Sequence, residues 1–243
     1  MAALSEEQQM IKDQASAWVR EQAPVSTFRA MRDQDLAQGF FSETWQAMIE
    51  MGWTGLVVPE TYGGAGLGYQ TLGLVLEQLG RNLVASPLYA SSVVGAAALM
   101  HSGSEDQKQA LLPKIADGGR LVVLALEEGP RHNPSQIKCR AKLTSSGVTL
   151  SGTKQFVMEG NAATDFVVAA NVDHGAGEQG VGLFLVACDT PGVRRHAVKT
   201  MDSRGYASVT FDGVAIDVEA MLAGPDTGQA VLESVLNVAT AAL

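Results

Sequence analysis

The chain has 243 residues, enough for one large domain or two of ordinary size. Its hydrophobic content of 46% is typical of a globular protein, and its formal net charge of −9 argues against nucleic acid or an anionic membrane surface as the main partner. Two cysteines, Cys139 and Cys188, are too few for a disulfide framework and lack the spacing of a zinc site. No apolar run is long enough for a membrane span and no signal-peptide pattern opens the sequence, so we expect a cytoplasmic protein without a membrane partner.

The first half of the chain has the periodicity of helices. Ser5 and Gln8 have the spacing of a capping box, and the apolar residues between positions 11 and 19 recur every three or four positions. A similar pattern begins at Ser42 and ends at Gly52. Three further helices are predicted at residues 71–79, 88–101 and 104–116.

Beyond Gly119 the pattern changes to an alternation with period two that is rich in β-branched residues. Turn signals such as Ser151-Gly152 and Pro191-Gly192 interrupt it. The alternation predicts strands at residues 121–126, 138–143, 148–150, 154–158, 166–170, 183–187 and 208–216. Short strands at this spacing favour a sandwich or barrel over a parallel α/β sheet.

The predicted fold class is therefore α+β, with helices first and strands second. We place an N-terminal helical domain at residues 1–118 and a middle β-barrel or sandwich domain at residues 119–226. Residues 227–243 return to helical periodicity and are strongly apolar, without a glycine or a basic last turn to end the helix. A helix this apolar must bury itself, so it either docks on the N-terminal helices or begins a further helical domain.

Patterns that carry chemistry are scarce. The sequence has no P-loop, zinc-protease motif or nucleophile elbow, and we assign no residue to a metal. The glycine-rich stretch at residues 63–68 fails the dinucleotide fingerprint, because Tyr69 stands where a third glycine is needed. We interpret it as a flexible surface loop. Phe156 is a lone aromatic within a predicted strand and is expected, on pattern alone, in the core.

The segment after the first predicted strand is the most unusual one. Glu127 and Glu128 are neighbours, so on a strand their carboxylates would point to opposite faces and would not act on one bond. Two prolines then stiffen a stretch whose side chains offer hydrogen-bond donors to an anion, namely Arg131, His132 and Asn133. This stretch is either a ligand contact or an ordinary loop.

Four groups of residues occur along the chain in a characteristic order and at characteristic separations. They are residues 4–8 (Leu-Ser-Glu-Glu-Gln), 52–60 with 62–66 (Gly-Trp-Thr-Gly-Leu-Val-Val-Pro-Glu and Tyr-Gly-Gly-Ala-Gly), 150–157 with 163–165 (Leu-Ser-Gly-Thr-Lys-Gln-Phe-Val and Ala-Thr-Asp), and 201–202 with 211–214 (Met-Asp and Phe-Asp-Gly-Val). Taken together, these groups resemble the N-terminal and middle domains of the acyl-CoA dehydrogenase family, and the resemblance covers essentially the whole chain.

The resemblance implies an N-terminal helical domain, a middle β-barrel domain and a C-terminal four-helix domain, with FAD between the last two. It implies an oxidoreductase of lipid metabolism in which a glutamate takes the α-proton of an acyl-CoA thioester while the β-hydride passes to the flavin. The product is the 2-enoyl-CoA, and the electrons go on to an electron-transferring flavoprotein. In the family the base comes from the C-terminal domain, so we expect it beyond Leu243 and name no catalytic residue in this chain. We expect a truncated or partly represented member whose complete form is a homotetramer or homodimer.

Carried over by position, the resemblance also implies site residues. The expected cofactor-binding residues are Leu124, Leu126, Glu127, Phe156, Val157 and Met158, and the expected substrate-binding residues are Arg131 and Asn133. Met158 stands where a serine or threonine is common, which removes a hydroxyl hydrogen bond to the flavin. A carboxylate at Glu127 would disfavour an anionic reduced flavin unless it is paired, and we hypothesise that Arg131 is its partner.

Two alternatives stay open within the same fold. One is a non-catalytic subunit that binds acyl-CoA or pairs with an active partner, and the other is a flavin-dependent oxidase or monooxygenase. The acyl group would be selected by a pocket between residues 79–100, the middle domain and further helices. Small residues leave room there for a bulky acyl group, although core packing explains them equally well: Ala90, Ser91, Ser92 and Gly95.

Overall fold

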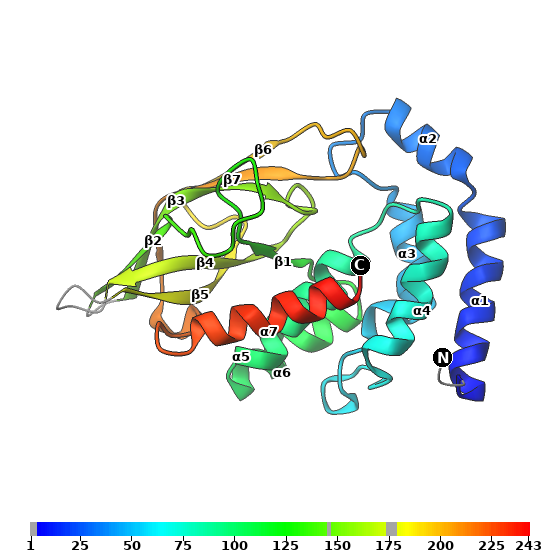
Figure 1. The fold of residues 1–243 in the computed structure, drawn as a ribbon, viewed down its shortest axis with the longest axis horizontal. Helices are drawn as coiled ribbons and strands as arrows, with labels where there is room; N and C mark the ends of the chain where they lie inside the picture. Colours follow the sequence, from blue (N-terminus) through cyan, green and yellow to red (C-terminus); the bar gives the residue numbers. More distant parts are fainter. Residues whose placement is uncertain (1–3, 145–146, 174–178) are drawn as a thin grey trace.

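The chain changes from helices to strands close to residue 120 (Figure 1). The computed structural model describes residues 4–144, 147–173 and 179–243. Within these ranges the α-helices are α1 (Glu6–Gln22), α2 (Val25–Asp33), α3 (Ser42–Glu50), α4 (Gly68–Arg81), α5 (Ala96–Ser102), α6 (Glu105–Ala116) and α7 (Gly228–Ala241). The other helical segments are the 3₁₀ turns η1 (Trp53–Gly55), η2 (Glu60–Tyr62) and η4 (Val218–Ala220) and the π-helix η3 (Leu88–Gly95).

Capping explains where the clearest helices begin. The side chain of Ser5 accepts the N–H of Gln8, and the Gln8 side chain accepts the N–H of Ser5, so the predicted capping box of α1 is confirmed. Ser104 and Gln107 form the same box before α6. Helix α2 was not predicted, because it follows Pro24, which provides no side-chain acceptor as a start signal.

The predicted helix at residues 88–101 consists of two different helices. It begins as the π-helix η3 and continues as α5. The π-helical part packs closely on strand β1 (Val122–Ala125), since a Cβ on Gly95 would lie 2.0 Å from the carbonyl oxygen of Val122. π-Helical segments are rare and occur frequently at functional sites.

The strands form one mixed sheet in the order β6-β7-β3-β2-β4-β5-β8, and β1 pairs with β4. The strands after β1 are β2 (Arg140–Thr144), β3 (Gly147–Val157), β4 (Asp165–Asp173), β5 (Gln179–Ala187), β6 (Val193–Ala197), β7 (Ala207–Ile216) and β8 (Met221–Ala223). Pairing is antiparallel except where β4 meets β1 and β2. The predicted α+β fold class is confirmed, because a helical region precedes a predominantly antiparallel sheet.

Three details of the sheet differ from the sequence prediction. The two strands predicted at 148–150 and 154–158 are a single strand, β3, so Ser151-Gly152 is not a turn. Gly152 instead allows β3 to approach Cys139, since a Cβ there would lie 2.8 Å from the Cys139 Cα. Strands β6 and β8 were missed, because β6 is mostly polar and exposed and β8 has three residues.

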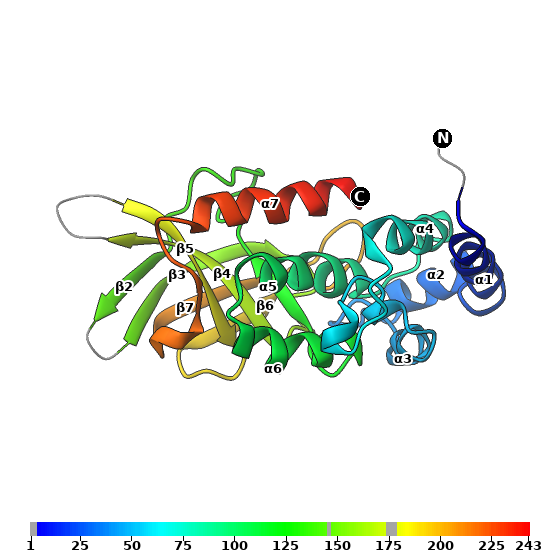
Figure 2. The same cartoon turned by 90° about the horizontal axis from the view of Figure 1, so that it is seen from below.

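Helix α7 lies along the sheet beside α5, as the two views show (Figures 1 and 2). It packs against α5, η3 and β5, and its buried residues are Gly228, Leu232, Val235 and Ala239. The expected burial of this apolar helix is therefore confirmed. The domain limits at residues 118 and 226 stay predictions. In the described part of the chain, none of the helices has the length and apolar character needed to cross a lipid bilayer.

Candidate functional site

An apolar pocket opens where β1 ends, between the sheet, η3 and α7. We define this apolar pocket, of about 170 Å³, by its lining residues Tyr89, Ala90, Val94, Leu124, Leu126, Glu127, His132, Phe156, Met158, Leu236 and Ala239. Five of the six residues expected to bind the cofactor lie in this one lining: Leu124, Leu126, Glu127, Phe156 and Met158. The structure thus brings together residues that lie up to 34 positions apart in the sequence. Their role as cofactor ligands stays a prediction.

Phe156 presents an aromatic ring to the apolar pocket. It lies where the pairing of β3 with β7 is irregular, between Lys154 and Val157, and its φ of 49° is in the left-handed region that a bulky residue rarely adopts. Such a conformation costs on the order of 1–3 kcal/mol and is often retained at binding sites. Phe156 is 43% exposed, so the core position expected from pattern alone is wrong.

Val157 differs from the other expected cofactor-binding residues. Its side chain is only 2% exposed and belongs to the core, and it does not line the apolar pocket. The bulge at Phe156 explains why, because the irregular pairing turns Phe156 outward and leaves Val157 inward. A contact through the Val157 backbone stays a prediction.

Glu127 and Glu128 follow β1 and have separate partners. The Glu127 oxygens lie 2.5 Å from Nδ1 of His132 and 3.0 Å from the N–H of Asn133, which donates to them. The hypothesised pairing with Arg131 is therefore replaced by a pairing with His132. Glu128 accepts N–H groups of the segment before β2 at 2.7 and 2.9 Å, which belong to Lys138 and Cys139.

Lys154 is the residue of this region that sequence reasoning missed. Its side chain is fully buried, and Nζ donates to Glu128 Oε1 at 2.6 Å and to the carbonyl oxygen of Leu126 at 3.0 Å. The N–H of Gln155 donates to the carbonyl oxygen of Glu127 at 2.7 Å. These bonds hold residues 126–128 against β3. The sequence signal that could have identified it is a lysine within a predicted strand. If such a lysine is buried, it requires an acidic partner.

A polar pocket adjoins the apolar one and shares Glu127 with it. Its lining residues are Glu127, Glu128, Gly129, Pro130, Arg131, Asn133, Gln136 and Lys138. Arg131 and Asn133, the two expected substrate-binding residues, therefore lie together. Glu128 is neutralised by Lys154, so the two cations Arg131 and Lys138 outnumber the remaining carboxylate, Glu127. This balance gives the pocket the chemistry to receive an anionic group such as a phosphate.

A larger cavity, of about 680 Å³, lies on the other side of Tyr89 and Met158, which line both spaces. Its walls come from α4, the segment before β7 and the end of α7, and they include Leu76, Leu79, Val84, Arg204 and Tyr206. Arg204 pairs with the buried Glu159 at 2.5 Å and donates to the carbonyl oxygen of Ser86. Burial raises the pKa of Glu159 above its ordinary value, and the neighbouring Arg204 opposes that shift.

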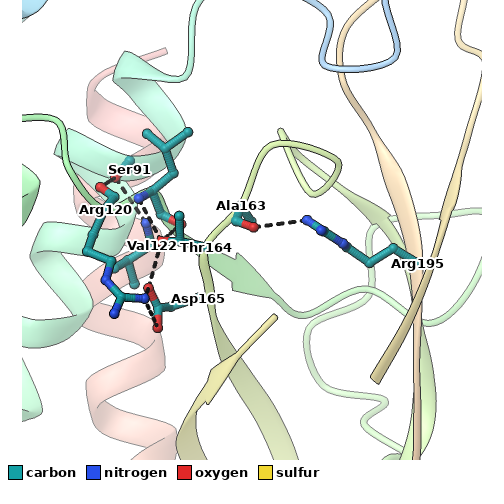
Figure 3. A network of polar contacts seen from close by, with 8 residues as sticks. Ser91, Arg120, Val122, Ala163, Thr164, Asp165 and Arg195 are labelled. Atoms are coloured by element: carbon teal, nitrogen blue, oxygen red, sulfur yellow. Dashed lines mark hydrogen bonds and ion pairs between the residues drawn. The ribbon is translucent and has the colours of Figure 1, made fainter. Parts of the chain in front are cut away.

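A polar network fixes the beginning of β1 (Figure 3). The N–H of Val122 donates to Ser91 Oγ of η3 at 3.1 Å, and Arg120 pairs with Asp165 of β4 at 3.2 Å. Thr164 Oγ1 donates to Asp165 and accepts the N–H of Leu121. Because Ser91 is used in this packing, its small size is explained without a bulky ligand. Ala90 alone of the four small residues noted in this helix lines the apolar pocket.

Comparison with known proteins agrees with this architecture. Residues 5–119 match the family model described as acyl-CoA dehydrogenase, N-terminal domain. The chain is 32% identical to the acyl-CoA dehydrogenase FadE27 of Mycobacterium tuberculosis over 203 residues, which are 83% of this chain and 52% of that protein. It is 30% identical to the mitochondrial 2-methylacyl-CoA dehydrogenase of Solanum tuberosum over 201 residues, which are 79% of this chain and 48% of that protein.

Among solved structures, the ChsE4-ChsE5 complex from Mycobacterium tuberculosis is similar with a TM-score of 0.83 and 28% identity, over 95% of this chain and 61% of that chain. The chain spans about half the length of the curated relatives it matches. It belongs to the acyl-CoA dehydrogenase family, whose members are oxidoreductases.

Proposed function

We propose that the chain forms the helical and β-sheet part of an FAD-dependent acyl-CoA dehydrogenase. The reaction is the α,β-dehydrogenation of an acyl-CoA thioester to the 2-enoyl-CoA, with the electrons passed to a flavoprotein acceptor. The observation that carries this proposal is the apolar pocket, where an exposed Phe156 ring and the end of β1 face one space.

The residues of the apolar pocket fit a flavin ring. Aliphatic side chains from β1 and η3 line the pocket, and Phe156 offers an aromatic face for stacking. Polar groups occur at one edge of the wall, where Glu127 and His132 lie. A planar aromatic ring with one polar edge matches this arrangement, and the cations of the adjoining polar pocket suit its phosphates or those of coenzyme A.

In this proposal, the residues of the chain bind and orient rather than react. When FAD is bound, its ring supplies the hydride acceptor. Leu124, Leu126 and Val94 would exclude water from a bound flavin ring, and Phe156 would stack against it. The large cavity behind Tyr89 and Met158 receives the acyl group. We assign the proton-abstracting base to none of the described residues.

The test is reduction of the flavin by substrate. The protein tested carries this chain together with the helical domain that the proposal expects to supply the base. It is loaded with FAD, and branched and straight short-chain acyl-CoA thioesters are added without oxygen. Bleaching of the visible flavin band, with the enoyl-CoA as product, is the expected result for a competent enzyme. FAD that binds but is not bleached by any thioester would overturn the dehydrogenase activity and leave flavin binding standing.

A second candidate is a subunit that works together with a different chain. The similar structure from Mycobacterium tuberculosis is a complex of ChsE4 with ChsE5, and Met158 provides no hydroxyl to the apolar pocket. Under this candidate, thioesters bleach the flavin only after a partner chain is added. A flavin-dependent oxidase or monooxygenase is separated from both by rapid reoxidation with molecular oxygen.

A further inference from the structure

Glu127 is an acidic side chain in the wall of an otherwise apolar pocket. Its side chain is 20% exposed, and it lines both the apolar and the polar pocket. Position 127 therefore lies at the border between the two spaces. A carboxylate this close to an apolar cavity acts over a longer range than one in water, because the surrounding dielectric is lower.

The Glu127 carboxylate is held in place from several sides. One oxygen is paired with His132 at 2.5 Å and the other accepts the N–H of Asn133 at 3.0 Å. Its own carbonyl accepts the N–H of Gln155, and the next residue is clamped by Lys154. Rotation of the carboxylate away from the pocket would break both side-chain contacts without a replacement.

Few other charges face the apolar pocket. The lining residues from η3, α7 and β1 are uncharged, and so are Phe156 and Met158. The Lys154 charge is matched by Glu128, and the cations Arg131 and Lys138 line the polar pocket instead. Among the described lining residues, the charge balance of the apolar pocket is therefore decided by Glu127 and His132.

Resting on the proposed function, we propose that the Glu127–His132 pair sets the relative affinity of the site for oxidised and reduced flavin. Transfer of one hydride from the substrate Cβ to the oxidised ring adds two electrons and one proton, so the ring gains one negative charge. The Glu127 carboxylate opposes that charge, and the contact of His132 Nδ1 with the carboxylate at 2.5 Å limits the opposition by offsetting part of its negative charge. The pair thus lowers the reduction potential of the bound flavin.

The experiment compares dissociation constants of oxidised FAD and of FAD reduced with dithionite, measured without oxygen on the full chain. In Glu127→Gln, the affinity for reduced FAD relative to oxidised FAD rises on the order of tenfold, because a like charge is removed. For this two-electron couple, tenfold corresponds to an increase in potential of about 30 mV. His132→Gln shifts the ratio in the opposite direction, and in the double variant the effect of His132→Gln disappears.

Arg131→Gln is the matched control, because Arg131 lines only the polar pocket. It leaves the ratio unchanged even if it weakens binding of both forms. An equal shift in Glu127→Gln and Arg131→Gln, or no shift in Glu127→Gln, would overturn the inference and leave the proposed function intact. Failure of the unaltered chain to bind either form of FAD would overturn both. Thermal unfolding of each variant checks that the fold is retained.

Discussion

Lys154 is a fully buried cation, and its surroundings explain how such a charge is tolerated. It is matched by the carboxylate of Glu128 and by the carbonyl oxygen of Leu126, so its charge and two of its donors are satisfied. Removing one partner of a buried pair leaves the other charge without compensation, which destabilises far more than the loss of a surface pair. The same contacts fix the wall of the apolar pocket.

We therefore expect Lys154→Met to lower the free energy of unfolding by about 3–5 kcal/mol. Lys199→Met is the control, because Lys199 pairs with Asp35 at the exposed surface and its loss changes stability little. Chemical denaturation measures the change in unfolding free energy in both variants. A loss in Lys154→Met no larger than in Lys199→Met would show that the buried pair does not hold the fold.

The two cysteines differ in their expected reactivity. Burial raises the pKa of the Cys139 thiol from its ordinary value near 9 to about 11, whereas Cys188 is half-buried. Since the thiolate is the nucleophile, iodoacetamide at pH 8 should modify Cys188 first and Cys139 only after unfolding. Peptide mass spectrometry of the folded chain decides this, and equal rates at the two cysteines would contradict the structure.

The raised pKa of Cys139 also has a consequence for stability. Between pH 9 and 11 the unfolded chain loses this proton while the folded chain keeps it. The contribution of Cys139 is therefore fully present below pH 9 and is lost as the pH rises toward 11. The decline in unfolding free energy over this window should be smaller in Cys139→Ala.

At the scale of single residues, the site could be predicted in part. Position in a family pattern was sufficient to gather Leu124, Leu126 and Phe156 around one pocket. The partner of Glu127 was not predictable, because Arg131 and His132 are neighbours in a loop whose path has no periodicity. Lys154 was missed because strand alternation treats a lysine as exposed.

Among the elements, η3 and β1 depend on each other. Gly95 allows the helix to lie against the carbonyl of Val122, and Ser91 accepts the N–H of the same residue. The π-helical turn places Tyr89, Ala90 and Val94 toward the apolar pocket. A sequence period of 3.6 does not distinguish this helix from an ordinary one, so residues 88–101 were predicted as a single α-helix.

Gly95→Ala should lower stability by about 1–3 kcal/mol, because the added methyl group meets backbone that has little room to move. Gly73→Ala in α4 is the matched control. A Cβ at Gly73 meets nothing within 4 Å, so this substitution should stabilise the chain by about 0.5–1 kcal/mol. Thermal unfolding of the two variants measures whether each substitution lowers or raises stability. Stabilisation by Gly95→Ala would contradict the observed contact of η3 with β1.

The strands that were predicted and those that were missed differ in burial. Strands β4 and β5 consist largely of buried apolar residues and were recognised from sequence. Strand β6 is exposed at the edge of the sheet, and its two arginines hide its alternation. The bulge in β3 is also invisible in the pattern, because it depends on pairing with β7.

At the scale of the whole molecule, the helices and the sheet share one continuous hydrophobic core. Helix α7 contributes to this continuity, because it packs on α5, η3 and β5 and closes one side of the apolar pocket. Tyr89 joins two of these elements, since its hydroxyl donates to the carbonyl oxygen of Ala239 at 2.9 Å. The change from helices to strands was evident from periodicity, whereas this docking depends on contacts between distant segments.

Tyr89→Phe should lower stability by about 1 kcal/mol and speed amide hydrogen exchange in α7 without affecting α1. Tyr62→Phe is the control, because the Tyr62 hydroxyl donates to the carboxylate of Glu105 at the exposed surface. Unchanged exchange in α7 of Tyr89→Phe would mean that the hydrogen bond does not hold this helix.

The central claim is that the apolar pocket receives the flavin ring. Titration of the full chain with FAD, followed by flavin fluorescence, tests it most directly when Phe156→Ala is compared with Met201→Ala. Met201 is a fully exposed hydrophobic residue outside the lining of the pocket. The account predicts that Phe156→Ala weakens binding on the order of tenfold, through lost stacking and apolar contact, while Met201→Ala has no effect. Equal affinities in the two variants, or no binding of FAD by the unaltered chain, would contradict it.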